Sequence, residues 1–164
     1  MKELLHPSVS AAADANGLLY MVMACDPELA DTAAFCEQYG FQPGQSANTI
    51  IVASKDDSSK TACCVVLATT KLDVNKTVRK LLGVKKASFA SQEFTRDHTG
   101  MEIGGVTAVG IQDMPIYIDA AVMAVPEVVM GGGNRSSKLL LAPKELTKLP
   151  NVTIVDDLAK EKEA

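Results

Sequence analysis

The chain has 164 residues, a length typical of one domain with a buried core. Its net charge of −4 excludes a generally basic surface that would coat nucleic acid, and an aromatic content of 4% argues against a platform for stacking exposed bases. No secretory leader and no apolar run of about eighteen residues is found, so we expect a cytoplasmic protein without a membrane partner.

The first part of the chain predicts a strand, a helix and a hairpin. The run "LYMVMACDP" at 19–27 is strand-like and ends at Asp26-Pro27, a pair that typically begins a helix, which would run over 28–40 and end at Gly40. The β-rich runs at 48–54 and 61–70 are joined by a polar turn at 55–60, which predicts an antiparallel hairpin. The four cysteines form no C-x-x-C pair, which favours reduced, buried thiols over a zinc site or a disulfide framework.

A basic segment comes after the hairpin. In "KLDVNKTVRKLLGVKK" at 71–86 six Lys and Arg residues accompany a single acid. A helix from Asp73 to Gly83 would gather its apolar residues on one stripe and its basic residues, Lys76, Arg79 and Lys80, on another. The basic stripe is a candidate for contact with a nucleic-acid backbone, and an ordinary solvated helix face is the alternative.

The rest of the chain is richer in strands. Short runs predict a strand at 86–91, a helix or turn at 92–98, strands at 114–123, 127–134 and 138–143, a short helix at 143–150 and a fraying charged tail at 155–164. Helices at both ends of a strand-rich centre predict an α+β fold with a mixed, strongly bent, barrel-like sheet flanked by helices. No linker or repeat divides residues 1–164, so we expect one domain.

Glycine is concentrated in two segments that match no nucleotide-binding motif. The stretch "TGMEIGGVTAVG" at 99–110 has four glycines, and such a cluster marks a place where the backbone closely approaches something. Its spacing is not G-x-G-x-x-G, and "GGGNRSSK" at 131–138 fails the phosphate-loop pattern. Asp119 interrupts an apolar run, which places it either at a strand end or beside a pocket.

Several of these segments, in this order, resemble the YbaK and prolyl-tRNA-synthetase-associated editing domain family. The resemblance covers about residues 20–155 and rests on motifs in both halves: "NTIIVA", "CVVLATTKLDVNK", "LGVKKASFA", Thr99-Gly100, Gly104-Gly105-Val106, Gly110, Ile118-Asp119, Gly131 to Gly133 and "LLLAPKEL". It implies a freestanding trans-editing aminoacyl-tRNA deacylase that cuts the ester of mischarged tRNA without a metal or cofactor. The expected partners are the acceptor end of mischarged tRNA and, as a second candidate, an aminoacyl-tRNA synthetase.

The resemblance also implies a site. The backbone N–H groups of Gly104 and Gly105 would polarise the ester carbonyl as an oxyanion hole does. Asp119 would lie at the floor of the pocket and Gly131, Gly132 and Gly133 at its opposite rim. Thr49 and Thr107 would contact the substrate, and Lys76, Arg79 and Lys80 would contact the tRNA backbone.

The sequence departs from the family at two positions, one of which is Ala108, where the family often has a proline within the glycine motif. Bacterial deacylases of the family have a lysine before the threonine of the first central strand, where this chain has Asn48 before Thr49. An amide donates hydrogen bonds but carries no charge, so either catalysis is weaker or the protein is a non-catalytic binder of the tRNA 3′ end, of aminoacyl-adenosine or of a synthetase. Lys60 would lie at the far end of the hairpin, which leaves Lys138 as the candidate to bring charge to the pocket.

Overall fold

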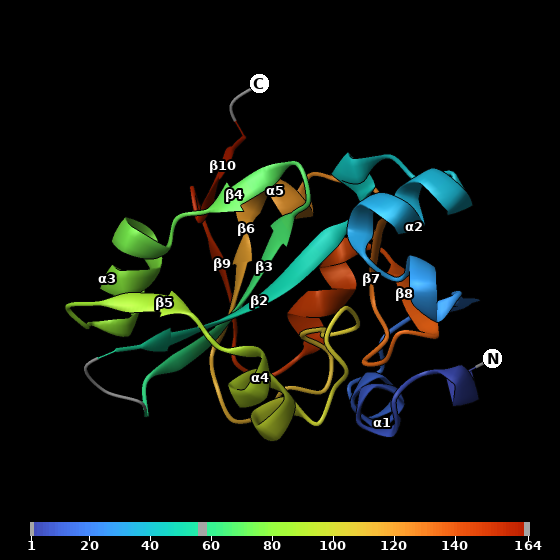
Figure 1. Ribbon diagram of the computed structural model, residues 1–164, viewed down its shortest axis with the longest axis horizontal. Coiled ribbons are helices and arrows are strands. Elements are labelled where there is room, and N and C mark those ends of the chain that lie inside the picture. Colours follow the sequence, from blue (N-terminus) through green and yellow to red (C-terminus); the bar gives the residue numbers. More distant parts are fainter. Residues whose placement is uncertain (1, 56–58, 163–164) are drawn as a thin grey trace.

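The computed structural model describes residues 2–55 and 59–162 and shows the predicted α+β class (Figure 1). The described strands form three sheets, with the orders β5-β2-β3-β6-β9, β1-β8-β7 and β10-β4. The strands are β1 (Met21–Ala24), β2 (Ala47–Ser54), β3 (Thr61–Leu67), β4 (Thr70–Leu72), β5 (Ala87–Phe89), β6 (Ile116–Asp119), β7 (Val128–Gly131), β8 (Ser137–Leu141), β9 (Val152–Val155) and β10 (Ala159–Glu161). The α-helices are α1 (Pro7–Ala15), α2 (Thr32–Tyr39), α3 (Arg79–Leu82), α4 (Gln92–Thr99) and α5 (Ala120–Met123).

The five-stranded sheet is mixed, as the sequence predicts. Strand β2 pairs antiparallel with β3 and β5, whereas β3, β6 and β9 run parallel to one another. The described strands form open sheets with no closed barrel among them, so the barrel-like shape is not seen in this part of the chain.

The predicted hairpin forms the centre of this sheet. Ala53 lies opposite Thr61 and Asn48 opposite Val66, while residues 56–58 of its turn lie outside the described part of the chain. Alternate residues of β3 enter two different cores, with Cys63 in one and Cys64 in the other. Because both faces of β3 are covered, its sequence is an apolar run without alternation.

The two helices predicted in the first half are both interrupted. A 3₁₀ turn, Pro27–Leu29, precedes α2, and α2 begins after Asp31, whose backbone is extended; the helix ends at Gly40 with φ +79°. The basic segment forms a π-helical turn, Val74–Val78, before α3, and it ends at Gly83 with φ +68°. The wider turn rotates the residues of α3 about the helix axis, so Leu81 is 38% exposed although the predicted stripe would bury it.

Several predictions for the ends of elements are wrong. Residues 120–123 form helix α5 where a continued strand was expected, and 100–115 form irregular turns. The tail does not fray over the described residues, because β9 and β10 pair with β6 and β4 and bury Leu158 between them. Helix α1, for which no element was predicted, begins at Pro7 and is capped by His6, whose Nδ1 accepts a hydrogen bond from the N–H of Ser8 at 3.2 Å. In the described chain no helix is long and apolar enough to span a membrane.

Candidate functional site

A cavity of about 340 Å³ lies among β2, the N-terminal end of α2, β7, β8 and the loop that comes after α4. Its wall includes five positions that the sequence singled out: Asn48, Thr49, Gly104, Gly131 and Lys138. The remaining wall is mixed, with apolar side chains such as Phe35 and Met130 beside polar ones such as Asp31 and Thr95. A concave site of this kind is a candidate for binding a small ligand or the end of a larger one.

Asn48 lies near the start of β2 and is held by helix α2. The hydroxyl of Thr32 donates a hydrogen bond to Oδ1 of Asn48 at 2.8 Å. This bond occupies the carbonyl end of the amide, and no described residue accepts a hydrogen bond from its Nδ2. Asn48 therefore offers its NH₂ group to the cavity as a donor.

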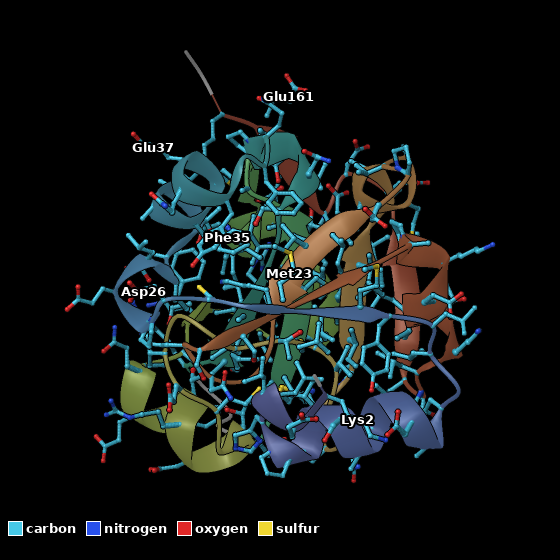
Figure 2. All side chains as sticks on the ribbon, turned by 90° about the vertical axis from the view of Figure 1, so that its right-hand side faces the viewer. Lys2, Met23, Asp26, Phe35, Glu37 and Glu161 are labelled. Atoms are coloured by element: carbon cyan, nitrogen blue, oxygen red, sulfur yellow. The ribbon has the colours of Figure 1, made fainter. Side chains whose placement is uncertain are left out.

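Lys138 brings a buried ammonium group to the same cavity. The residue is only 7% exposed, and its Nζ donates a hydrogen bond to the carbonyl of Ala30 at 2.7 Å and lies 5.1 Å from the centroid of the Phe35 ring. Phe35 lies inside the molecule, whereas Glu37 of the same helix projects outward (Figure 2). Burial lowers the pKa of Lys138, and the nearby Asp31 carboxylate and the thiol of Cys25 partly oppose this effect.

The sheets explain why Asn48 and Lys138 share one wall. Ser46, just before Asn48, forms a parallel bridge with Val129 of β7, and Gly131 of β7 pairs with Lys138 of β8. The edge of the large sheet thus meets the small sheet at this cavity. Lys60 lies beside the turn at the opposite end of the hairpin, as the sequence predicts.

The two threonines of the predicted site have different surroundings. Thr49 lines the cavity, and its buried hydroxyl has no hydrogen-bond partner among the described residues. Thr107 is fully buried outside the cavity wall, where its N–H donates to Sδ of Met101 at 3.5 Å. Thr107 therefore does not line this cavity, although its buried hydroxyl, like that of Thr49, has no hydrogen-bond partner among the described residues.

Gly104 lines the cavity and is packed against an arginine that the sequence analysis did not single out. Its backbone has φ +92°, and no described residue accepts a hydrogen bond from its N–H. A Cβ at this position would collide with the guanidinium of Arg135. Arg135 Nη1 donates to Asp31 Oδ1 at 3.2 Å and to the carbonyl of Ile103 at 3.1 Å, and its Nε donates to the carbonyl of Pro27 at 2.9 Å.

Gly105 is not the free amide that the sequence suggested. Its N–H donates to the carbonyl of Glu102 at 2.9 Å, and its carbonyl accepts from the N–H of Gly133 at 2.7 Å. A Cβ on Gly105 would meet the backbone of Asn134, and one on Gly131 would meet the backbone of Gly105. The predicted close approach therefore exists, but much of it joins the two glycine segments of this chain to each other.

Gly132 and Gly133 also serve packing. A Cβ on Gly132 would meet Ser137, and one on Gly133, which has φ +88°, would meet His6 and Val9. Neither residue lies on the cavity wall, in contrast to Gly131. Of the three glycines expected at the opposing rim, one therefore lines the cavity.

Asp119 lies at a strand end, away from the cavity. It is 2% exposed at the junction of β6 and α5. Burial raises its pKa, and the backbone N–H groups of Leu158, Ala121 and Ala159 oppose the rise. These neighbours show that its carboxylate faces the C-terminal segment, so its placement at the pocket floor was wrong.

The predicted tRNA contacts lie on a different part of the surface. Lys76 and Lys80 are exposed on the π turn and α3, and Arg79 is partly exposed with its Nε bonded to the carbonyl of Asn75 at 2.9 Å. None of the three lines the cavity. Within the described residues there is no group of three His, Cys, Asp or Glu side chains that could hold a metal ion.

Comparisons with known proteins identify the family of the chain. The model of the aminoacyl-tRNA editing domain family matches residues 26–149. YwhH, an uncharacterized protein of Bacillus subtilis, is 28% identical over 137 residues, which are 82% of this chain and 86% of YwhH.

Solved structures are similar over nearly the whole chain. A crystal structure described as a candidate trans-editing enzyme for prolyl-tRNA synthetase has a TM-score of 0.80 and 26% identity, and the match covers 96% of this chain and 99% of that one. The hypothetical protein APE2540 has the same fold, with a TM-score of 0.82, 21% identity and coverage of 93% and 99%. The chain belongs to the YbaK-like aminoacyl-tRNA editing domain family.

Proposed function

We propose that the protein is an aminoacyl-tRNA deacylase that hydrolyses the ester between a wrong amino acid and the terminal ribose of tRNA. One observation supports the proposal: a single cavity of about 340 Å³ is lined by Asn48, by Lys138, whose side chain is buried, and by Gly104, whose N–H has no acceptor among the described residues. An attacked ester develops negative charge on its carbonyl oxygen, and preorganised donors stabilise that charge.

The reaction requires only water as co-substrate. Water attacks the carbonyl carbon, the bond to the ribose oxygen breaks, and the ribose oxygen takes up the proton that the water loses. In this proposal the N–H of Gly104 donates to the developing oxyanion. The amide of Asn48, oriented by Thr32, donates either to the same oxygen or to the ribose.

Lys138 supplies the charge that position 48 lacks in this proposal. Its Nζ uses one of three donors on the carbonyl of Ala30, which leaves two for the substrate. Because the ammonium is buried, its hydrogen bonds to the substrate are less screened than those of a surface lysine.

A panel of mischarged tRNAs tests the proposal by measuring release of the amino acid. We expect the wild-type protein to deacylate at least one of them, and Lys138→Met to lower kcat by about 100-fold, the usual cost of losing one oxyanion donor. Lys144→Met is the matched control, since Lys144 is exposed and outside the cavity. The proposal fails if no tRNA in the panel is hydrolysed above the rate in buffer.

The neutral side chain of Asn48 favours a second candidate, a family member that binds without catalysis. Such a protein would hold the tRNA 3′ end, aminoacyl-adenosine or a synthetase in the same cavity. It is distinguished by saturable binding of a non-hydrolysable aminoacyl-adenosine amide together with no ester loss from any tRNA of the panel. Ester loss from one tRNA would exclude it.

A further inference from the structure

We propose that Phe89 is a stacking platform for the nucleotide that precedes the terminal adenosine of tRNA, at the junction between the cavity and a neighbouring basic groove. This inference rests on the proposed function, because it assumes that the terminal adenosine and its ester occupy the cavity. It also revises an expectation, since the low aromatic content argued against any base platform.

Phe89 is the one exposed Phe or Tyr side chain in the described part of the chain, with 59% of its surface accessible. It ends β5, the edge strand of the five-stranded sheet, where it lies opposite Val52. The pairing of β5 with β2 fixes the backbone that carries the ring, although the ring itself is exposed. Base–aromatic stacking uses a ring presented in this way.

The same ring borders two hollows. Phe89 contributes to the wall of the cavity that contains Asn48 and Lys138, and to the wall of a larger groove of about 780 Å³. Ala87 and Ser88, which precede Phe89 on β5, line only the groove of the two. The strand therefore leads from the groove to the ring, and the ring itself separates the groove from the cavity.

The groove carries cations at the positions where the tRNA phosphates would lie. Residues of β4, β10, the π turn and β5 line it, and β4, β5 and β10 are labelled in Figure 1. Lys71, Lys160 and Lys162 are exposed along it. Its acids are Asp73 and Glu161. Asp73 accepts hydrogen bonds from the N–H of Lys76 at 3.3 Å and from Thr77 Oγ1 at 3.1 Å, and its Oδ2 lies 3.9 Å from Lys160 Nζ, so it offsets part of the charge of Lys160.

This combination favours a nucleic-acid strand over a protein segment. A basic groove leads to an exposed ring and then to the cavity, an order that matches the phosphates, the base and the terminal nucleoside of an RNA end. The predicted basic residues Lys76 and Lys80 lie on the same side of the molecule, on the π turn that borders the groove and on the helix after it. The tRNA acceptor end would therefore approach along β5.

The probe is an RNA hairpin with a single-stranded 3′ tail that ends in adenosine and has 2-aminopurine at the preceding nucleotide. We expect wild-type protein to bind it with quenching of the 2-aminopurine fluorescence. Phe89→Ala should weaken binding about tenfold and remove the quenching, and Phe89→Trp should keep both. Ile154→Ala is the matched control, because Ile154 is a 39% exposed apolar residue on β9, the opposite edge of the same sheet.

Three results would overturn the inference: no binding of the tailed RNA to wild type, equal binding by Phe89→Ala and wild type, or equal affinity for a hairpin without the tail. The last would mean that the protein reads the duplex alone. Because the probe carries no amino acid, its binding is measured separately from deacylation. Loss of deacylation with intact quenching refutes only the catalytic proposal, and hydrolysis of mischarged tRNA with equal Phe89→Ala affinity refutes only the stacking.

Discussion

The cavity and the basic groove meet at Phe89 but are built differently. Around the cavity, the polar groups central to the proposal are buried or partly buried and are fixed by neighbours, as with Lys138 on Ala30 and Asn48 on Thr32. Around the groove, Lys71, Lys160 and other cations are exposed on short strands. A buried donor acts at one atom with little screening by salt, whereas exposed cations act together and lose their effect as salt rises.

This difference separates two kinds of experiment. Changes in the cavity wall should alter stability or the catalytic step, with little dependence on ionic strength. Changes along the groove should alter tRNA affinity and its salt dependence, with little effect on folding. Substitutions in both regions test this division. The largest effect is expected in the glycine segments, and the smallest is the pH dependence that Lys138 causes.

The largest effect is expected where the glycine segments support the cavity wall. In Gly105→Ala the new methyl group would meet the backbone of Asn134, which cannot move as a flexible side chain would. We expect the free energy of unfolding to fall by about 2–4 kcal/mol. Gly44→Ala is the control, because nothing lies within 4 Å of its added Cβ. Equal urea denaturation midpoints for the two variants would contradict the close packing at Gly105.

The next effect tests whether Lys138 replaces the lysine that the family has at position 48. If it does, adding Asn48→Lys to the Lys138→Met variant should raise its rate of deacylation about tenfold. The same change in the wild-type background should add little, because the site would then hold two ammonium groups that repel each other. Rates of deacylation of the four proteins form a double-mutant cycle. Additive effects across the cycle would show that the two positions act separately.

The sequence predicted the members of this site better than their roles. Hydrophobic runs and turn residues identified β2, β3 and the end of α2, because these obey local rules. Asn48 and Gly104 were found through the family pattern and Lys138 through the search for a lysine that could replace the missing one, and all three line one cavity. Arg135 and Thr32 were missed because their importance comes from partners more than fifteen residues away.

The errors at Gly105 and Asp119 have a common cause. A glycine or a buried acid in a sequence signals a constraint on the backbone or on a charge, but it does not say whether the chain itself or a ligand meets that constraint. Gly105 meets Asn134, and Asp119 meets the amides near Leu158. The fraying tail was wrongly predicted for a similar reason, since its pairing with β4 and β6 depends on tertiary contacts.

A moderate effect is expected on the groove side. Changing Lys76, Arg79 and Lys80 together to Ala should weaken tRNA binding about tenfold at low salt. It should also flatten the plot of log K against log salt by about one unit for each phosphate that the variant no longer neutralises. The melting temperature should change little, because these side chains are wholly or partly exposed. An unchanged salt slope would show that the basic stripe is ordinary solvated surface. The stripe would then add nothing to the binding of tRNA phosphates along the groove.

The smallest effect concerns the cost of burying Lys138. Its pKa in the folded protein is below the ordinary 10.5, chiefly because of burial, so the unfolded chain binds more protons between the two values. Raising the pH through that window should therefore increase the free energy of unfolding of wild type relative to that of Lys138→Met. Taking the difference between the two proteins removes the contributions of Cys64 and the tyrosines, which both proteins share. The measurement is the free energy of unfolding in urea for both proteins from pH 7 to 10. A difference that stays constant, or that falls with pH, would mean that the ammonium is not held against a desolvation penalty, and Lys138 would then belong with the screened cations of the groove.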